Sequence, residues 1–250
     1  MGRLIRIKKI KVEKTPPKPA DKDWGRKREV LPVIKPPSVS PNKNKTPVLS
    51  GTELNKLIIT HAELGNEEEV RRLLKAGAWY NANKQGTTAL TAASKNGHTE
   101  VVKLLVQAKA DVTILDDVGW TAFRWAVWEE KLDTAEILLS AGANIDLRDK
   151  QGRTALIEAA WHGMVGTVLF LLEHDADANI QDIANRTALM GATDNPVIVQ
   201  HLLEYNAKVN VKNKDGETAL DWAKSGKQKD VVKLLKENGA KPGWRVWKEG

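Results

Sequence analysis

The chain of 250 residues contains no cysteine. Disulfide bonds, thiolate metal sites and cysteine nucleophiles are therefore excluded together, and the composition fits a reducing compartment. Long apolar runs are also missing: the densest one, residues 168–172, is five residues long, whereas a membrane-spanning helix needs about twenty. We expect no transmembrane segment and an intracellular, cytoplasmic location, with organelle import and nuclear location left open.

Motifs for catalysis or cofactor binding are scarce as well. Neither Gly-x-Gly-x-x-Gly nor a phosphate loop ending in Gly-Lys-Ser/Thr occurs. The glutamates at 67–69 are predicted to stand at a helix start, where the helix dipole favours carboxylates, so they do not indicate an acid–base pair. The histidines lack the i, i+4 spacing of a zinc site; they are His61, His98, His162, His174 and His201. We therefore expect no enzyme, no cofactor and no metal.

Acidic and aromatic residues are rare in the first fifty positions. This segment carries fourteen lysines and arginines against four carboxylates, a net charge of +10, whereas the remaining residues sum to −3. It holds eight of the ten prolines and a single aromatic residue, Trp24. Such a composition buries too little apolar surface to offset the entropy lost on ordering. We predict an extended, basic, proline-rich arm over residues 1–49. Its predicted docking cations are Arg3, Arg6, Lys8, Lys9, Lys11, Arg26, Lys27 and Arg28.

The rest of the chain is periodic from residue 52 onward. A Thr-Ala-Leu or Thr-Ala-Phe motif recurs with spacings of 33, 33, 33 and 31 residues, at Thr88, Thr121, Thr154, Thr187 and Thr218. Two residues before each threonine stands a residue that tolerates a left-handed backbone, namely Gly86, Gly119, Gly152, Asn185 or Gly216. A fixed period of this length is the signature of a solenoid, in which single units are stabilised by stacking.

One unit, residues 86–118, shows the expected local structure. Thr88 is a good N-cap for a short first helix that ends at Asn96-Gly97. A second helix follows, in which apolar residues recur at i, i+3, i+4 and i+7 from Val101. The residues from 110 to 119 then project as a hairpin-like loop into the next unit.

This pattern resembles the ankyrin repeat family over about four-fifths of the chain. The motifs that carry the resemblance are Gly97-His98-Thr99-Glu100-Val101-Val102, Gly142-Ala143-Asn144-Ile145-Asp146 and Thr218-Ala219-Leu220-Asp221-Trp222-Ala223. The resemblance implies an all-α solenoid of about six units, each a helix-turn-helix with a hairpin-like loop. We divide the chain into the arm at 1–49, a repeat domain at 50–241 and a short tail at 242–250.

The chain departs from the family pattern in three ways. Alanine replaces the family's proline after each threonine, which loses the preset φ that favours helix entry. The histidine that the family places three residues after the threonine is replaced throughout, by Thr91, Arg124, Ile157, Met190 and Asp221. The fifth unit has lost two residues between positions 190 and 195 and gains Pro196. We predict a shortened first helix there, and the weakest joint of the array at 190–196.

In the family, partners contact the loop tips and the exposed side of the first helices. Carried over by position, these surfaces predict partner-binding residues at Trp120, Trp128, Trp161, Arg153, Arg186, Lys84, Gln85, Lys95, Glu129 and His162. We expect the three tryptophans to form one aromatic strip bordered by the two arginines, with little role in folding, since tryptophan and arginine are frequent interface anchors. The alternative is that the rings are structural lids. Two other tryptophans, Trp125 and Trp222, are expected to face the repeat stack.

Three functions fit these features. The leading hypothesis is a non-catalytic protein–protein interaction module, a scaffold or accessory subunit of a larger assembly that binds through the concave face and loop tips and docks with its arm. The alternative is a subunit associated with nucleic acid or ribonucleoprotein, in which the arm neutralises phosphates or another polyanion. A third is an enzyme accessory or inhibitor whose concave face blocks a site. The apolar segment 30–34 argues against a purely electrostatic arm, because it suits an apolar groove or a sheet edge.

Overall fold

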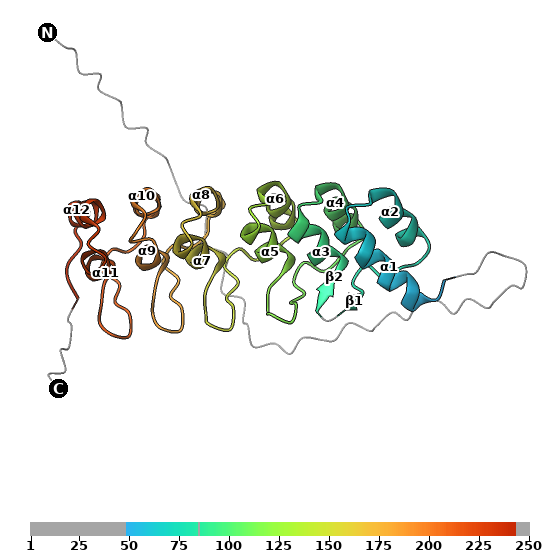
Figure 1. Ribbon diagram of the computed structural model, residues 1–250, viewed down its shortest axis with the longest axis horizontal. Coiled ribbons are helices and arrows are strands. Elements are labelled where there is room, and N and C mark those ends of the chain that lie inside the picture. The colour runs from blue at the N-terminus through green and yellow to red at the C-terminus, as the bar shows by residue number, and fades with distance from the viewer. Residues whose placement is uncertain (1–48, 85, 244–250) are drawn as a thin grey trace, which may run out of the picture. The chain divides into compact units, whose positions relative to one another are not determined.

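The structure is a computed structural model that describes residues 49–84 and 86–243. Within these residues twelve helices form six successive pairs (Figure 1). The first helices of the pairs are α1 (Gly51–Glu63), α3 (Ala89–Asn96), α5 (Ala122–Trp128), α7 (Ala155–Trp161), α9 (Ala188–Gly191) and α11 (Ala219–Ser225). The second helices are α2 (Glu67–Lys75), α4 (Thr99–Gln107), α6 (Leu132–Ser140), α8 (Val165–Glu173), α10 (Pro196–Glu204) and α12 (Lys229–Glu237). The predicted all-α array of six repeating units is confirmed.

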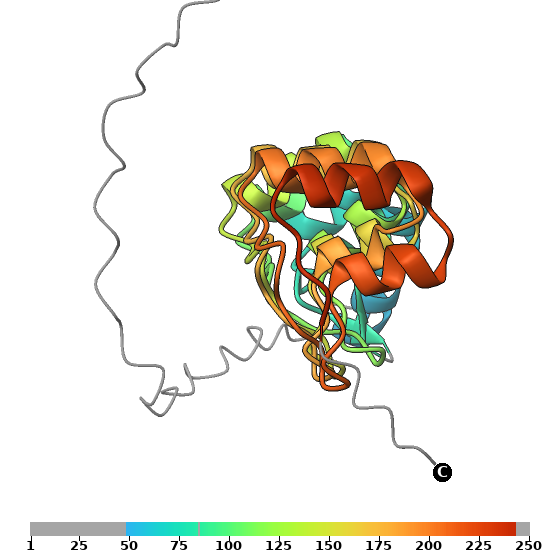
Figure 2. The ribbon, with the colours of Figure 1, turned by 90° about the vertical axis from the view of Figure 1, so that its left-hand side faces the viewer.

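Each first helix packs against the first helix of the next unit, from α1 through to α11. Viewed along the row, the pairs superimpose and the connecting loops project on the same side (Figure 2). Only the first of these loops contains strands in the described residues: β1 (Asn83–Lys84) pairs antiparallel with β2 (Thr87–Thr88). The loops and the first helices together form one surface, which we call the concave face.

The core repeats with the sequence. One leucine in each second helix is fully buried, at Leu73, Leu105, Leu138, Leu171, Leu202 and Leu235. Burial of a leucine side chain contributes about 2 kcal/mol, so this single column is a large part of the stacking free energy. A matching column of buried alanines lets the first helices approach closely; it consists of Ala93, Ala126, Ala159, Ala192 and Ala223.

Helix starts follow the predicted capping chemistry in the first four units. The hydroxyl of Ser50 accepts from the backbone N–H of Glu53, whose carboxylate accepts from the backbone N–H of Ser50, which completes a capping box. The threonines at 88, 121 and 154 each accept from the N–H three residues later. These caps satisfy donors that the first helical turn leaves without partners.

Two further sets of polar side chains repeat along the array, and neither is among the features predicted from the sequence. In the loops, Asp116, Asp149, Asp182 and Asn213 each accept from the N–H groups two and four residues later. Between units, a side-chain oxygen accepts from a backbone N–H of the next unit. The acceptor side chains, each paired with its donor N–H, are Asn81 with Asp111, Asp146 with Asp177, Asn179 with Lys208, and Asn210 with Lys241. We call the second set the rungs. Together they fix the shape of the loops and the spacing between them.

The fifth unit is shortened, as predicted. Its first helix, α9, has four residues, whereas α7 and α11 have seven each. The hydroxyl of Thr187 is buried without a hydrogen-bond partner, so α9 lacks the side-chain cap of the earlier units. The indole of Trp161 fills the space beside the short helix, because a Cβ added to Gly191 would lie 1.4 Å from the ring. That this joint is the weakest of the array remains a prediction.

The described helices include none that is both long and apolar enough to cross a membrane.

Candidate protein-interaction surface

Three tryptophans meet in the middle of the concave face. The ring centroids of Trp120 and Trp125 are 4.7 Å apart, and those of Trp120 and Trp128 are 5.6 Å apart. Trp120 directly precedes the N-cap of α5, and the other two lie on α5 itself. All three side chains are half-buried. We call these three residues the aromatic cluster.

Polar groups fix the orientation of the cluster. The indole N–H of Trp125 donates to the carboxylate of Asp116, which also shapes the preceding loop. The Lys95 ammonium lies 4.2 Å from the centroid of the Trp125 ring, a cation–π contact. His162 adds an edge-to-face ring contact with Trp128 at 4.8 Å. The rings therefore present defined faces to solvent.

The predicted single strip of Trp120, Trp128 and Trp161 is wrong. Trp161 belongs to a second group, in which its ring lies 6.3 Å from that of Trp222 and 4.4 Å from the guanidinium of Arg186. Trp161 and Trp222 both pack against the core. The physical reason is the short α9, because the space beside Gly191 admits the Trp161 ring. We therefore predict that Trp161, unlike Trp128, contributes to folding, contrary to the expectation from its repeat position.

Of the two tryptophans expected to face the repeat stack, Trp222 does so and Trp125 does not. Trp222 faces the stack as predicted, and its indole N–H donates to the carboxylate of Glu217 at 2.9 Å. Trp125 was expected in the stack but lies in the aromatic cluster. The hydrogen bond from its indole to Asp116, nine residues earlier in the preceding loop, holds Trp125 in the cluster. A spacing of nine residues matches neither the helical period nor the 33-residue repeat, so the sequence pattern did not predict this contact.

A buried ion network lies beneath the cluster. Arg124 stands where the family has histidine, and its Nη2 contacts Glu158 at 2.7 Å and Asp149 at 3.2 Å. Its Nη1 donates to the carbonyl oxygen of Arg153 at 2.9 Å, so one side chain of α5 holds the next loop. Arg153 was predicted to border the strip, but its guanidinium pairs with Asp149 and Glu158, each at 3.1 Å.

Arg186 is engaged in a similar way in the next unit. Its guanidinium pairs with Asp182 at 2.6 Å, and the Asp182 side chain is fully buried. Burial alone would raise the pKa of Asp182, but hydrogen bonds from the Arg186 side chain and from the backbone N–H groups of Arg186 and Ala184 outweigh it and hold that pKa below its ordinary value. This carboxylate therefore stays ionised, and Arg186 is held by it against Trp161.

The remaining predicted residues lie at the edges of this surface or outside the described residues. Lys84 and Lys95 are exposed at the loop of β1 and at the end of α3, His162 is exposed next to Trp128, and Glu129 is half-buried as the C-cap of α5. Gln85 and the arm cations Arg3, Arg6, Lys8, Lys9, Lys11, Arg26, Lys27 and Arg28 fall outside the described residues. The extended arm, and any polyanion bound to it, remain predictions. In residues 49–84 and 86–243 no three His, Asp or Glu side chains are grouped to hold a metal ion.

Comparison with known proteins gives matches over the whole described array. The family model described as "Ankyrin repeats (3 copies)" matches residues 39–116, 57–149, 108–182 and 176–244. Among curated proteins, protein phosphatase 1 regulatory subunit 12A of Mus musculus and of Homo sapiens are 44% identical over 68 residues. That match covers 24% of this chain and 7% of each relative, so the chain spans a small part of their length.

Two solved structures cover far more of the chain. An ankyrin repeat domain from Acinetobacter baumannii AYE superimposes with a TM-score of 0.69 at 28% identity, covering 74% of this chain and 98% of that one. A chain in the complex of a predatory endopeptidase from Bdellovibrio bacteriovorus with an immunity protein gives a TM-score of 0.65 at 30% identity. It covers 73% of this chain and 97% of that one.

Proposed function

This chain belongs to the ankyrin repeat family, and we propose that it is a non-catalytic accessory or scaffold subunit that holds a protein partner on its concave face. Repeats of this family generally mediate protein–protein interaction. The aromatic cluster is the proposed contact, and the loop tips extend it.

The observation that carries this proposal is the chemistry of the exposed surface. The cluster brings three half-buried indoles together, and apolar side chains stand exposed at the loops, with Val118 at 59% and Ile183 at 57% of their accessible surface. Monomeric proteins rarely expose contiguous apolar patches, and tryptophan is enriched among the residues that dominate binding free energy.

Two of the relatives support the accessory role. One is named as a regulatory subunit of a phosphatase, and one structure is titled as an endopeptidase in complex with an immunity protein. Each of these proteins belongs to an assembly that contains an enzyme. By this analogy the partner proposed here is an enzyme or a subunit of an enzyme assembly, with the chain itself supplying no catalytic group.

The test is affinity capture with the full chain, with and without nuclease, followed by measurement of the dissociation constant of each captured protein. We expect Trp128→Ala to weaken binding by about 2 kcal/mol, roughly thirtyfold in Kd. Tyr205→Ala is the matched control, because Tyr205 is an exposed aromatic at the end of a second helix. Equal loss in both variants would contradict the proposal, and capture that nuclease abolishes would favour the nucleic-acid hypothesis instead.

A further inference from the structure

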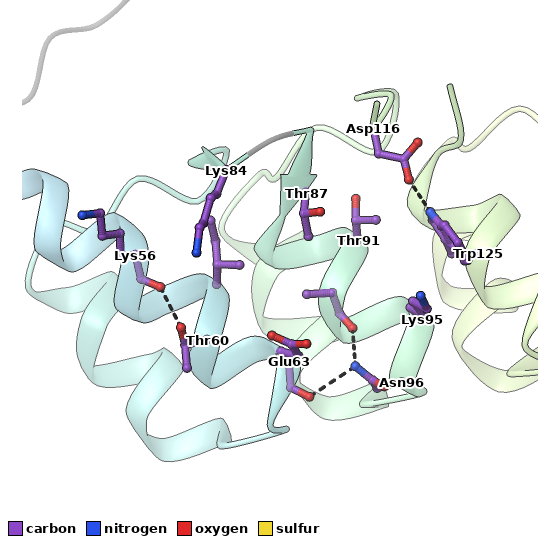
Figure 3. A pocket seen from close by; sticks show the side chains of 12 residues that line it. Lys56, Thr60, Glu63, Lys84, Thr87, Thr91, Lys95, Asn96, Asp116 and Trp125 are labelled. Atoms are coloured by element: carbon purple, nitrogen blue, oxygen red, sulfur yellow. Dashed lines mark hydrogen bonds between the residues drawn. The ribbon is translucent and has the colours of Figure 1, made fainter. Parts of the chain in front are cut away.

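A polar pocket of about 540 Å³ lies on the concave face beside the aromatic cluster. It is formed between α1 and α3, with strands β1 and β2 on one side and the loop of Asp116 with Trp125 on the other (Figure 3). Its volume is in the range that takes a drug-sized ligand, about 300–1,000 Å³, and exceeds the needs of a single carboxylate. The pocket therefore has room for a short stretch of chain.

Positive charge is in excess along this pocket. Lys84 reaches down from β1 between the two helices, Lys95 lies at the end of α3, and Lys56 lies at the rim on α1 (Figure 3). Within residues 49–84 and 86–243 none of the three ammonium groups makes an ion pair. These ammonium groups would attract an anionic ligand, and that of Lys95 also lies over the Trp125 ring.

Two carboxylates, Asp116 and Glu63, line the pocket with the three lysines, so one positive charge is in excess. Asp116 already accepts from the indole N–H of Trp125 and from the backbone N–H groups of Val118 and Trp120. Glu63 is then the one lining carboxylate among the described residues whose oxygens make no hydrogen bond within the fold. The hydroxyl of Thr87 on β2 adds hydrogen-bonding capacity, whereas that of Thr91 on α3 is buried and pairs with the hydroxyl of Thr88 at 3.0 Å.

A second hollow adjoins the pocket. This hollow, of about 250 Å³, lies against Trp79 and shares Lys56, Ile59 and Lys84 with the pocket. Trp79 is 53% exposed, and its backbone N–H is held by the side chain of Asn55 at 2.8 Å. A peptide that crosses the shared lysines can place an acidic residue in the pocket and an apolar one against Trp79.

We propose that this pocket, lined by Lys84 and Lys95 with Lys56 at its rim, binds an acidic extended segment of the protein partner. The inference rests on the proposed function and names the chemistry of the partner. Single carboxylates fit better than a phosphate dianion, because Glu63 repels a dianion more strongly and the described lining residues include no arginine. The basic N-terminal residues of this chain, with a net charge of +10, do not match it.

The experiment titrates the full chain with acetylated hexaglutamate, with hexaglutamine as the uncharged control and with inorganic phosphate. We expect hexaglutamate to bind, hexaglutamine not to bind measurably, and the affinity to fall as salt rises from about 0.05 M to about 0.5 M. Lys84→Gln should weaken hexaglutamate binding about threefold. Lys150→Gln is the matched control, because Lys150 occupies the same loop position two units away and should leave binding unchanged.

Two outcomes would overturn the assignment: hexaglutamate binding no better than hexaglutamine or phosphate, or Lys84→Gln and Lys150→Gln weakening binding equally. The same variants, assayed with the captured partner, separate the two proposals. If Trp128→Ala weakens partner binding and Lys84→Gln does not, the pocket assignment fails and the proposed function stands. If neither variant affects the partner, the proposed function fails as well.

Discussion

Trp128 and Trp161 are equivalent residues, 33 positions apart at the ends of α5 and α7, yet their surroundings differ. Trp128 contacts Trp120 and His162 on the surface of the concave face. Trp161 packs against the core, and its indole nitrogen is buried without a hydrogen-bond partner in the described structure. The difference shows that repeat position alone does not assign a side chain to binding or to stability. The neighbouring unit decides, because α9 is the shortest of the described helices and leaves space for the ring beside Gly191.

The two junctions that flank α7 are also stabilised by different interactions. Between α5 and α7 the units are joined by the buried network of Arg124, Asp149, Glu158 and Arg153. Between α7 and α9 the indole of Trp161 packs beside Gly191, and the side chain of Thr187 does not cap α9. One junction depends on charge pairing and the other on shape, so they respond to different substitutions.

The largest effect is expected at the charged junction. Arg124→Met removes the cation between two buried carboxylates and leaves Arg153 as their one cationic partner in the described structure. Breaking a buried ion pair from one side costs about 3–5 kcal/mol, so the free energy of unfolding in urea should fall by that amount. Arg71→Met, which removes an exposed i, i+4 pair with Glu67, is the control and should cost less than about 1 kcal/mol. Similar losses in both variants would show that the network adds nothing to the junction.

A smaller loss is expected at the junction of shape. Gly191→Ala places a methyl group inside the Trp161 ring, so the indole must move, and overpacking of this kind costs about 1–3 kcal/mol. Gly166→Ala is the matched control, because that helical glycine has open space around its Cβ position and alanine is the better helix former. Thermal unfolding should show a lower Tm for the first variant and an unchanged or higher Tm for the second. A stable Gly191→Ala protein would refute the account of how Trp161 is held.

The rungs give the smallest predicted effect, with opposite signs at two equivalent positions. Burial raises the pKa of Asp146. The hydrogen bond from the backbone N–H of Asp177 opposes this rise in pKa, and charge repulsion by the Asp177 carboxylate adds to it. A raised pKa means that the folded state binds more protons, so the stability linked to this group is present at low pH and lost as pH rises through the folded pKa. Asp146→Asn should therefore stabilise the protein at neutral pH, by less than about 1 kcal/mol because the group is partly exposed.

This gain should shrink as the pH falls below the ordinary pKa of aspartate, about 4. The reverse exchange, Asn179→Asp at the next rung, should destabilise at neutral pH because it introduces the carboxylate that the other substitution removes. Urea denaturation of both variants across the acidic range measures the two effects. A gain from Asp146→Asn that persists unchanged to low pH would contradict the assignment.

The sequence was sufficient to predict the repeating fold, because the residues that recur with its period each act on neighbouring residues in the chain. The threonine caps, the left-handed loop positions and the buried leucines all follow from spacing, and the shortening of α9 follows from two missing residues. The loop residues at 116, 149, 182 and 213 share this period and could have been found by the same method.

The candidate surface was less predictable, because it depends on contacts between different units. The direction of the Trp161 ring depends on the space beside Gly191, which belongs to the following unit. The engagement of Arg153 depends on Glu158 and on Arg124 of the preceding unit. The polar pocket likewise combines lysines from α1, β1 and α3, whose proximity no single repeat encodes.

The most direct test of the central claim measures partner affinity and thermal stability on the same two variants, Trp128→Ala and Trp161→Ala. The account predicts that Trp128→Ala binds the partner about thirtyfold more weakly, with a change in unfolding free energy near or below 1 kcal/mol. It predicts that Trp161→Ala loses about 3 kcal/mol of stability, because the ring leaves a cavity beside α9. The reverse pattern, with Trp128→Ala unfolding readily and Trp161→Ala losing affinity while remaining stable, would contradict the account.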